Sequence, residues 1–153
     1  MKGTAESAEE SGFDGGKKVK GRKHHIVIDT TGCVLVATVH AANVHDSRGA
    51  RPLFERLFET APTVQWIWAD QAYEGDLVKW VKTTFSCTLD IVYKTAKEFK
   101  VLPRRWVVER TFAWLSRYRR LAREYEKRPA SSTAIIYAAS IRIMLKKLYP
   151  QAA

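Results

Sequence analysis

The feature that most constrains the fold is a pair of apolar runs that flank a short turn near the start of the chain. Residues 25–29 read HIVID, TTG follows as a turn, and residues 33–41 read CVLVATVHA. Two such runs joined by a tight, glycine-containing loop predict a β-hairpin. The second run is apolar at nearly every position, which is typical of a strand buried on both faces.

Beyond the hairpin, helical and extended patterns alternate. Residues 43–61 predict a helix capped by Asn43 or Asp46, residues 64–68 a strand that ends in a polar turn at Asp70, and residues 75–85 a second helix. TLDIVYK predicts a short strand, residues 95–103 a loop, and Pro103 the start of a long arginine-rich helix. With one more helix at the end, this order predicts the mixed α/β class, a mixed sheet with helices packed against it.

The last helix is expected over residues 131–148, with Ser131 or Ser132 as its cap. Its apolar side chains recur at i, i+4 and i+7 and predict a buried stripe, formed by Ala134, Ala138, Ile141, Leu145 and Leu148. At the other end, residues 1–16 hold few apolar side chains and are expected to form a flexible lead-in. Residues 17–149 are then one folded domain.

The charge of the chain is strongly basic and unevenly distributed. The net charge is +10, and residues 100–128 alone hold ten Lys or Arg against three Glu. A second basic run, KKVKGRKHH, covers residues 17–25. A single basic run is as often a solvated face as a binding surface, but two runs favour an anion-binding surface. Nucleic acid is the first class of partner expected for it, and an anionic membrane is the second.

Cysteine usage and hydropathy indicate the cellular compartment in which the chain is expected. Cys33 and Cys87 form no CxxC pair, so no zinc site is expected, and both are expected to be buried free thiols in a reducing cytosol. No apolar run approaches the roughly 20 residues that a membrane-spanning helix needs. The first residues lack the apolar stretch of a signal peptide.

Two carboxylates are the candidates for chemistry. Asp70 directly follows the strand that ends in WA, where open α/β sheets place ligand groups, although a helix cap or turn aspartate is the commoner role there. Glu109 lies in the arginine-rich helix beside the stripe of Val108, Phe112 and Leu115, so it is expected to border the core. A simple ion pair with Arg105 is its alternative role.

A carboxylate from a strand end and one from a packed helix can together hold Mg²⁺, which takes oxygen ligands and leaves room for substrate phosphate. The histidines offer a rival metal site, because His24, His25, His40 and His45 lie close in sequence beside Asp46, but their spacing matches no known zinc pattern. The tryptophans are expected in the core, with base stacking by Trp106 and Trp114 as the minor alternative.

Three segments carry a resemblance to a known family. They are KGRKHHIVIDTTGCVLVATVHAANVHD, WADQAYEG and RRWVVERTFAWLSRYRRLAREYE. Together they resemble the C-terminal part of bacterial insertion-sequence transposases of the DDE type, in particular the insertion-sequence five-like group. The resemblance runs from about Phe13 to Leu148, and the combination of ADxxYxG with RxxVERxFxWLxxxRRL is rarely met elsewhere.

The resemblance implies a ribonuclease-H-like core in which Asp, Asp and Glu bind two Mg²⁺ ions, with Mn²⁺ as a substitute. It places the second Asp at Asp70 and the Glu at Glu109, as catalytic residues and metal ligands. It also implies a bacterial enzyme at the nucleoid that cuts the ends of its element and joins them to target DNA. The basic residues expected to bind that DNA are Lys17, Lys18, Lys20, Arg22, Lys23, Arg105, Arg110, Arg117, Arg119 and Arg120.

The chain departs from the family pattern in two places. Of the Tyr-Arg-Glu-Lys signature around the Glu, only Arg105 and Glu109 are present; Leu102 and Ser116 stand at the Tyr and Lys places, with Arg117 as a substitute for the Lys. The family's first Asp and its strand lie upstream of the segment with which this chain begins, so the resemblance implies an N-terminal truncation. Asp14, Asp29 and Asp46 are the candidates for a replacement acid.

Three functional classes follow. The first is a DDE transposase domain, the second a remnant that binds DNA without cutting it, and the third a basic nucleic-acid-binding protein with no catalytic history. A missing first strand also predicts a gap in the sheet or an exposed edge, and hence marginal stability or homo-oligomer formation.

Overall fold

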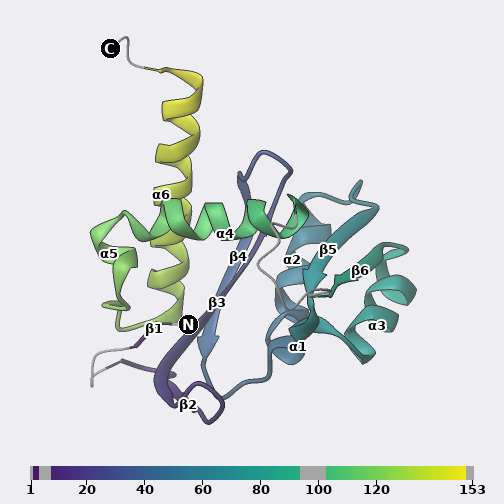
Figure 1. Cartoon of the computed structure of the whole chain (residues 1–153), viewed down its shortest axis with the longest axis horizontal. Coiled ribbons are helices and arrows are strands. Elements are labelled where there is room, and N and C mark those ends of the chain that lie inside the picture. The colour runs from purple at the N-terminus through teal and green to yellow at the C-terminus, as the bar shows by residue number, and fades with distance from the viewer. Residues whose placement is uncertain (1, 4–7, 94–102, 151–153) are drawn as a thin grey trace.

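The expected hairpin is formed by β3, Val19–Ile28, and β4, Val34–Ala41, which pair antiparallel from Arg22↔Ala41 to Ile28↔Val34. In its turn, Asp29 Oδ1 accepts hydrogen bonds from the backbone N–H groups of Thr31 and Cys33, and Gly32 takes a φ of +88°. The computed structural model in Figure 1 describes residues 2–3, 8–93 and 103–150. The loop expected over residues 95–103 therefore lies almost wholly outside the described residues.

Two short strands from the expected lead-in pair with the first part of β3. They are β1, Lys2–Gly3, and β2, Gly12–Asp14, both antiparallel to β3 between Val19 and Arg22. Further along β3, residues 24–28 pair with β4 on one side and with no described strand on the other.

A second, two-stranded sheet contains β5, Trp66–Asp70, and β6, Thr88–Val92, which run parallel. They are joined through the short 3₁₀ helix η1, Gln71–Tyr73, and α3, Asp76–Phe85. The two strands and α3 were expected from the sequence, whereas η1 stands where a polar turn was expected. No hydrogen-bonded ladder between described strands joins the two sheets, which agrees with the expected gap.

One apolar core nevertheless spans both sheets. Its bridge is α2, Arg51–Thr60, which follows the short α1, Asp46–Gly49. The core combines side chains from α2, α3 and strands of both sheets: Val36, Leu53, Phe54, Leu57, Ile67, Leu77, Val81 and Leu89. Helix α2 contacts β3 and β4 of the first sheet and also α3, which packs on β6 of the second. Burial of one apolar core therefore stabilises both sheets.

The start of α1 corrects the expected cap. His45, and neither Asn43 nor Asp46, is the N-cap, because its ring accepts a hydrogen bond from the backbone N–H of Ser47. Asp46 is the first helical residue and pairs instead with Lys23, at 2.9 Å. A carboxylate in the first turn still suits the positive end of a helix.

A second core covers the opposite face of β4. Three helices supply it: α4, Pro103–Ser116, α5, Arg119–Ala122, and α6, Pro129–Leu148. Val34, Ala37 and Val39 of β4 pack there against Leu115, Leu121, Ile136 and Ala139. Strand β4 is thus covered on both faces, as expected, except that Leu35 is 39% exposed.

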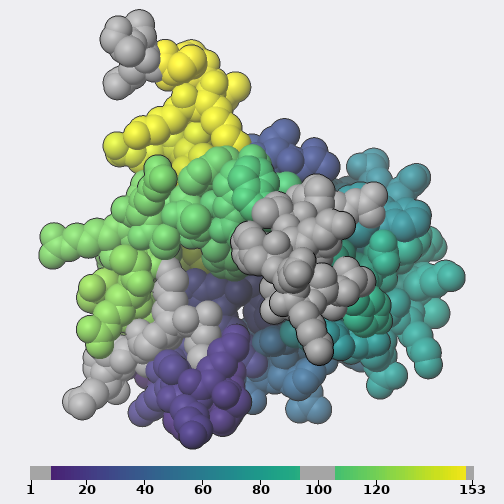
Figure 2. Space-filling model, in the orientation of Figure 1, coloured from purple at the N-terminus to yellow at the C-terminus, as the bar shows by residue number. Residues whose placement is uncertain are grey.

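The buried face of α6 differs from the expected one. The stripe from Ala134 to Leu148 faces outward, and Ile141 and Leu145 are about half exposed. The buried side carries Ser132, Ile136, Ala139 and Ser140, because small side chains let α6 approach β4 closely. Figures 1 and 2 show the C-terminal end of α6 projecting beyond α4, and Lys147 near that end reaches back to the Trp114 ring and to the carbonyl of Thr31. The N-cap is also different, since Arg128 holds that position without a side-chain hydrogen bond.

No helix among the described residues has both the length and the hydropathy to cross a membrane. Cys87 is buried and Cys33 only half-buried, and both are free thiols, so the expectation of burial is wrong for Cys33.

Candidate catalytic and DNA-binding site

Asp70 is the last residue of β5 and is exposed. Its Oδ1 accepts a hydrogen bond of 3.1 Å from the backbone N–H of Ala72 and so caps η1. The strand-end position and the capping role considered for this residue therefore coexist. Its other oxygen, Oδ2, forms no hydrogen bond or ion pair with the described residues and faces no competing partner among them.

Glu109 lies on the exposed side of α4, not at the edge of the core as expected. Among the described residues of that helix, the most buried side chains are Thr111 and Leu115. Thr111 donates a hydrogen bond to the carbonyl of Gly32 in the hairpin turn, and Leu115 packs in the core on β4. The expected pair between Glu109 and Arg105 lies outside the described residues, since the side chain of Arg105 is not among them.

The elements that carry the two carboxylates are in contact, because α4 packs on β5. Both side chains are exposed, so a cation and a substrate phosphate can reach them from solvent. Two carboxylates are a donor set that Mg²⁺ accepts, with water or phosphate completing its shell. Among the described residues, no group of three or more His, Cys, Asp or Glu side chains is placed to hold a metal ion.

A hydrogen-bonded chain of aromatic side chains fixes η1 immediately after Asp70. The Tyr73 hydroxyl donates to His25 Nδ1, His25 Nε2 lies 2.6 Å from His40 Nε2, and His40 Nδ1 donates to the carbonyl of Ala41 at 2.9 Å. These contacts require His25 to carry its proton on Nε2. The chain thus joins the hairpin to the turn that positions Asp70.

The electrostatics of this chain keep its members uncharged. Burial lowers the pKa of His25 to about 4, helped by the neighbouring His40. Burial also lowers the pKa of His40, and it raises the pKa of Tyr73, where the charge of Asp70 acts in the same direction. Both rings and the phenol are therefore neutral near pH 7. The sequence indicated the histidines as a rival metal site or as packed or capping residues, and it did not predict their pairing with Tyr73. The β-hairpin register places His25 and His40 on neighbouring strands.

The remaining histidines also have partners other than a metal. His24 Nε2 donates to Glu124 at 2.8 Å, and His45 caps α1. Of the three candidate replacement acids, Asp29 closes the hairpin turn and Asp46 pairs with Lys23. Asp14 closes the turn after β2 by accepting from the backbone N–H groups of Gly16 and Lys17.

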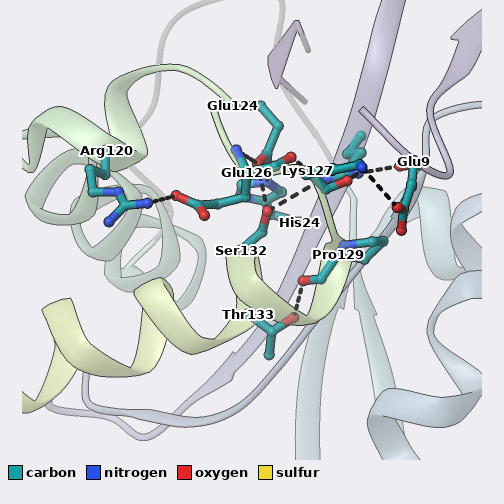
Figure 3. A network of polar contacts seen from close by, with 10 residues as sticks. Glu9, His24, Arg120, Glu124, Glu126, Lys127, Pro129, Ser132 and Thr133 are labelled. Atoms are coloured by element: carbon teal, nitrogen blue, oxygen red, sulfur yellow. Dashed lines mark hydrogen bonds and ion pairs between the residues drawn. The ribbon is translucent and has the colours of Figure 1, made fainter. Parts of the chain in front are cut away.

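Arg22 has a structural role, which corrects the expectation that it binds DNA. Its side chain is completely buried and donates to the carbonyls of Glu9, Glu126 and Lys127. It also lies 3.6 Å from Glu124. Figure 3 shows the surrounding network, in which Ser132 and His24 converge on Glu124. A side chain without exposed surface cannot contact a phosphate, so Arg22 instead joins β3 to the segment before α6.

The other basic candidates differ in how accessible they are. Lys17, Lys18 and Lys20 are exposed in and beside the turn between β2 and β3. Lys23 is half-buried and is held by Asp46 and by the carbonyl of Val44. This turn therefore presents three lysines to solvent, whereas Lys23 mainly serves the fold.

On the helical side, Arg110 lies between the rings of Trp106 and Trp114, at 4.7 and 4.6 Å from their centroids. It also donates to the carbonyl of Thr31 in the hairpin turn. Trp106 and Trp114 thus stack on an arginine of their own helix. The remaining arginines, Arg117, Arg119 and Arg120, are exposed, and Arg120 pairs with Glu126 at 2.6 Å.

Comparisons with known proteins give the family of the chain. The family described as transposase DDE domain matches residues 2–144, which include Asp70 and Glu109. The chain belongs to the transposase DDE domain family. No solved structure matches it.

A curated relative is also a transposase. The transposase assigned to insertion sequence element IS402 of Burkholderia cepacia is 32% identical over 118 residues. The matched region covers 71% of this chain and 55% of that protein. The chain therefore spans about half the length of this relative.

Proposed function

We propose that the protein acts in DNA transposition as the catalytic domain of an insertion-sequence transposase, cutting and joining DNA strands with Mg²⁺ or Mn²⁺. The observation that carries the proposal is the family match across residues 2–144 together with the position of Asp70, at the end of a strand that contacts the helix of Glu109. The two carboxylates are its proposed catalytic residues. Its place in the cell is the bacterial cytoplasm, at the nucleoid.

In this proposal Asp70 and Glu109 hold the metal. A divalent cation bound there would neutralise charge on the attacking and leaving oxygens of a phosphodiester. The chain's own contribution is orientation: the bond from Ala72 to Asp70 fixes the carboxylate, and the Tyr73–His25 contact fixes the turn that carries it. Exposure of both acids leaves space for the DNA strand.

The DNA would be held by the accessible basic residues. These are Lys17, Lys18, Lys20, Arg117, Arg119 and Arg120, with Arg110 fixing the orientation of α4 and Arg105 as a further candidate. Guanidinium groups bind phosphate oxygens in pairs, and several such contacts make binding strongly salt-dependent.

A nicking assay tests the enzymatic proposal. Supercoiled plasmid carrying the element ends is incubated with Mg²⁺ and wild-type protein, Asp70→Asn or Glu109→Gln. Each substitution is expected to reduce strand cleavage by about 100-fold or more, since each removes charge from the transition state. Asp76→Asn, an exposed acid in the first turn of α3, is the matched control and should cleave like wild type. Full activity in both carboxylate variants would refute the proposal.

The second candidate is a DNA-binding protein without cleavage activity. It is favoured by the finding that Asp70 and Glu109 belong to no cluster of three potential metal ligands among the described residues. In that case wild-type protein would leave the plasmid intact at every metal concentration but would still bind DNA with an affinity that falls steeply with salt.

A further inference from the structure

A cavity of about 410 Å³ lies between the outer edge of β4, the α1–α2 segment and the first turn of α6. Its size is within the range of small-ligand sites, about 300–1,000 Å³. The residues that matter for its chemistry are Thr38 and His40 of β4, Arg48 and Gly49 of α1, Arg56 of α2, and Ala130 of α6. The residues named so far for catalysis and DNA binding are not among those that line it.

The charged side chains of the cavity wall are all basic. Arg48 and Arg56 line it, and no Asp or Glu does so among the described residues. Both arginines are exposed, and neither guanidinium forms a hydrogen bond or ion pair with a described residue. By contrast, Arg51, which lies on α2 with Arg56, is stacked over Trp80. Two uncommitted guanidinium groups at one cavity suit a tetrahedral anion.

The floor of the cavity adds hydrogen-bond donors. Ala130 belongs to the first turn of the 20-residue helix α6, whose N-cap contributes no side-chain hydrogen bond. Pro129 has no N–H, and the N–H groups of Ser131 and Ser132 donate to the carbonyl of Arg128, which leaves the N–H of Ala130 for a ligand. The start of a helix also carries partial positive charge, which attracts anions. Thr38 supplies a second and independent feature, since its Oγ1 is buried without a hydrogen-bond partner among the described residues. The hydrogen of this hydroxyl can rotate about the C–O bond to donate to a ligand.

His40 forms a fixed wall of the cavity. Both ring nitrogens already have partners, His25 and the carbonyl of Ala41. Gly49 packs directly on this ring, because a Cβ at that position would lie 2.0 Å from His40 Nε2. The available ligand groups are therefore the two arginines, the α6 N-terminus and Thr38.

We infer that this cavity is a phosphate-binding site, separate from Asp70 and Glu109, and that its phosphate is a phosphodiester of the bound DNA. The phosphate chemistry follows from the cavity alone, whereas the DNA source rests on the proposed function. Helix α1, which lines the cavity, also packs on η1, and η1 directly follows Asp70. A DNA strand bound in the cavity would therefore contact an element that packs against the turn after Asp70.

The test compares Arg48→Gln and Arg56→Gln with Arg51→Gln, a matched loss of charge outside the cavity. In the first arm, inorganic phosphate is added and thermal unfolding is followed. Phosphate should raise the Tm of wild type and Arg51→Gln in a saturable way, and should do so much less for the two cavity variants. Equal responses in all four proteins would overturn the site.

In the second arm, binding of a fluorescent DNA duplex is measured over a range of salt concentrations. Each cavity variant should weaken binding and reduce the slope of log K against log salt by about 1, the value for one lost phosphate contact. A phosphate effect without a DNA effect would overturn the DNA source and assign the cavity to a free phosphate compound. If wild type binds no DNA while the phosphate effect persists, the proposed function fails and the phosphate site stands.

Discussion

At the scale of single residues, the most consequential group is the buried carboxylate of Glu124. It receives hydrogen bonds from His24 and Ser132 and faces the buried guanidinium of Arg22. Removing one member of a buried ion pair leaves the other uncompensated, which costs about 3–5 kcal/mol. We therefore expect Glu124→Ala to lower the free energy of unfolding by about that amount. Glu126→Ala, which removes the partner of the exposed Arg120, should cost less than about 1 kcal/mol.

The contribution of Glu124 to the free energy of unfolding is expected to decrease at low pH. Burial tends to raise the pKa of Glu124, but the hydrogen bonds from His24 and Ser132 outweigh it, so the pKa is lowered in the folded protein. Its stabilisation is then complete above the unfolded pKa and is lost as the pH falls through the folded pKa. Urea unfolding at about pH 7 and about pH 3 should show a smaller difference between wild type and Glu124→Ala at the lower pH. An equal difference at both would contradict this assignment.

At the scale of elements, sequence periodicity predicted the existence and order of the hairpin, of β5, α3 and β6, and of the last helix. Those signals are local, because a period of two or of 3.6 residues is fixed by backbone geometry. The faces and ends of helices depend on partners far along the chain. Ser132 serves Glu124 and not the start of α6, and small side chains turn toward β4. Asp70 and Glu109 remain predictions from the sequence, whereas the Tyr73–His25–His40 chain required the strand register.

The two faces of α6 provide the prediction at this scale. Ile136 is 1% exposed and Ile141 is 51% exposed, so the same substitution can be compared in both environments. Ile136→Ala should cost about 2–5 kcal/mol of unfolding free energy, through lost burial and the cavity left behind. Ile141→Ala should cost no more than about 0.5 kcal/mol. Urea unfolding followed by circular dichroism measures both, and a larger loss at Ile141 would restore the stripe expected from sequence.

At the scale of the whole molecule, two sheets share one core but not one hydrogen-bonded ladder. Helix α2 packs on the first sheet and on α3, which covers the second. Residues 24–28 of β3 pair with one described strand, and β5 pairs with no described strand except β6. An unpaired strand edge is a template for another chain. We therefore expect the protein to self-associate through these edges, with a weight-average sedimentation coefficient that rises with concentration.

A charge on the edge strand tests this mechanism. Trp66 of β5 is 52% exposed, and Trp66→Lys should reduce self-association because a lysine on an edge strand disfavours pairing. Tyr125→Lys replaces a similarly exposed aromatic in the segment between α5 and α6 and should leave association unchanged. Leu145→Lys probes the competing contact, the exposed apolar face of α6. If Leu145→Lys abolishes association and Trp66→Lys does not, the helix face and not the sheet edge is the contact; a monodisperse, cooperatively unfolding monomer would exclude both.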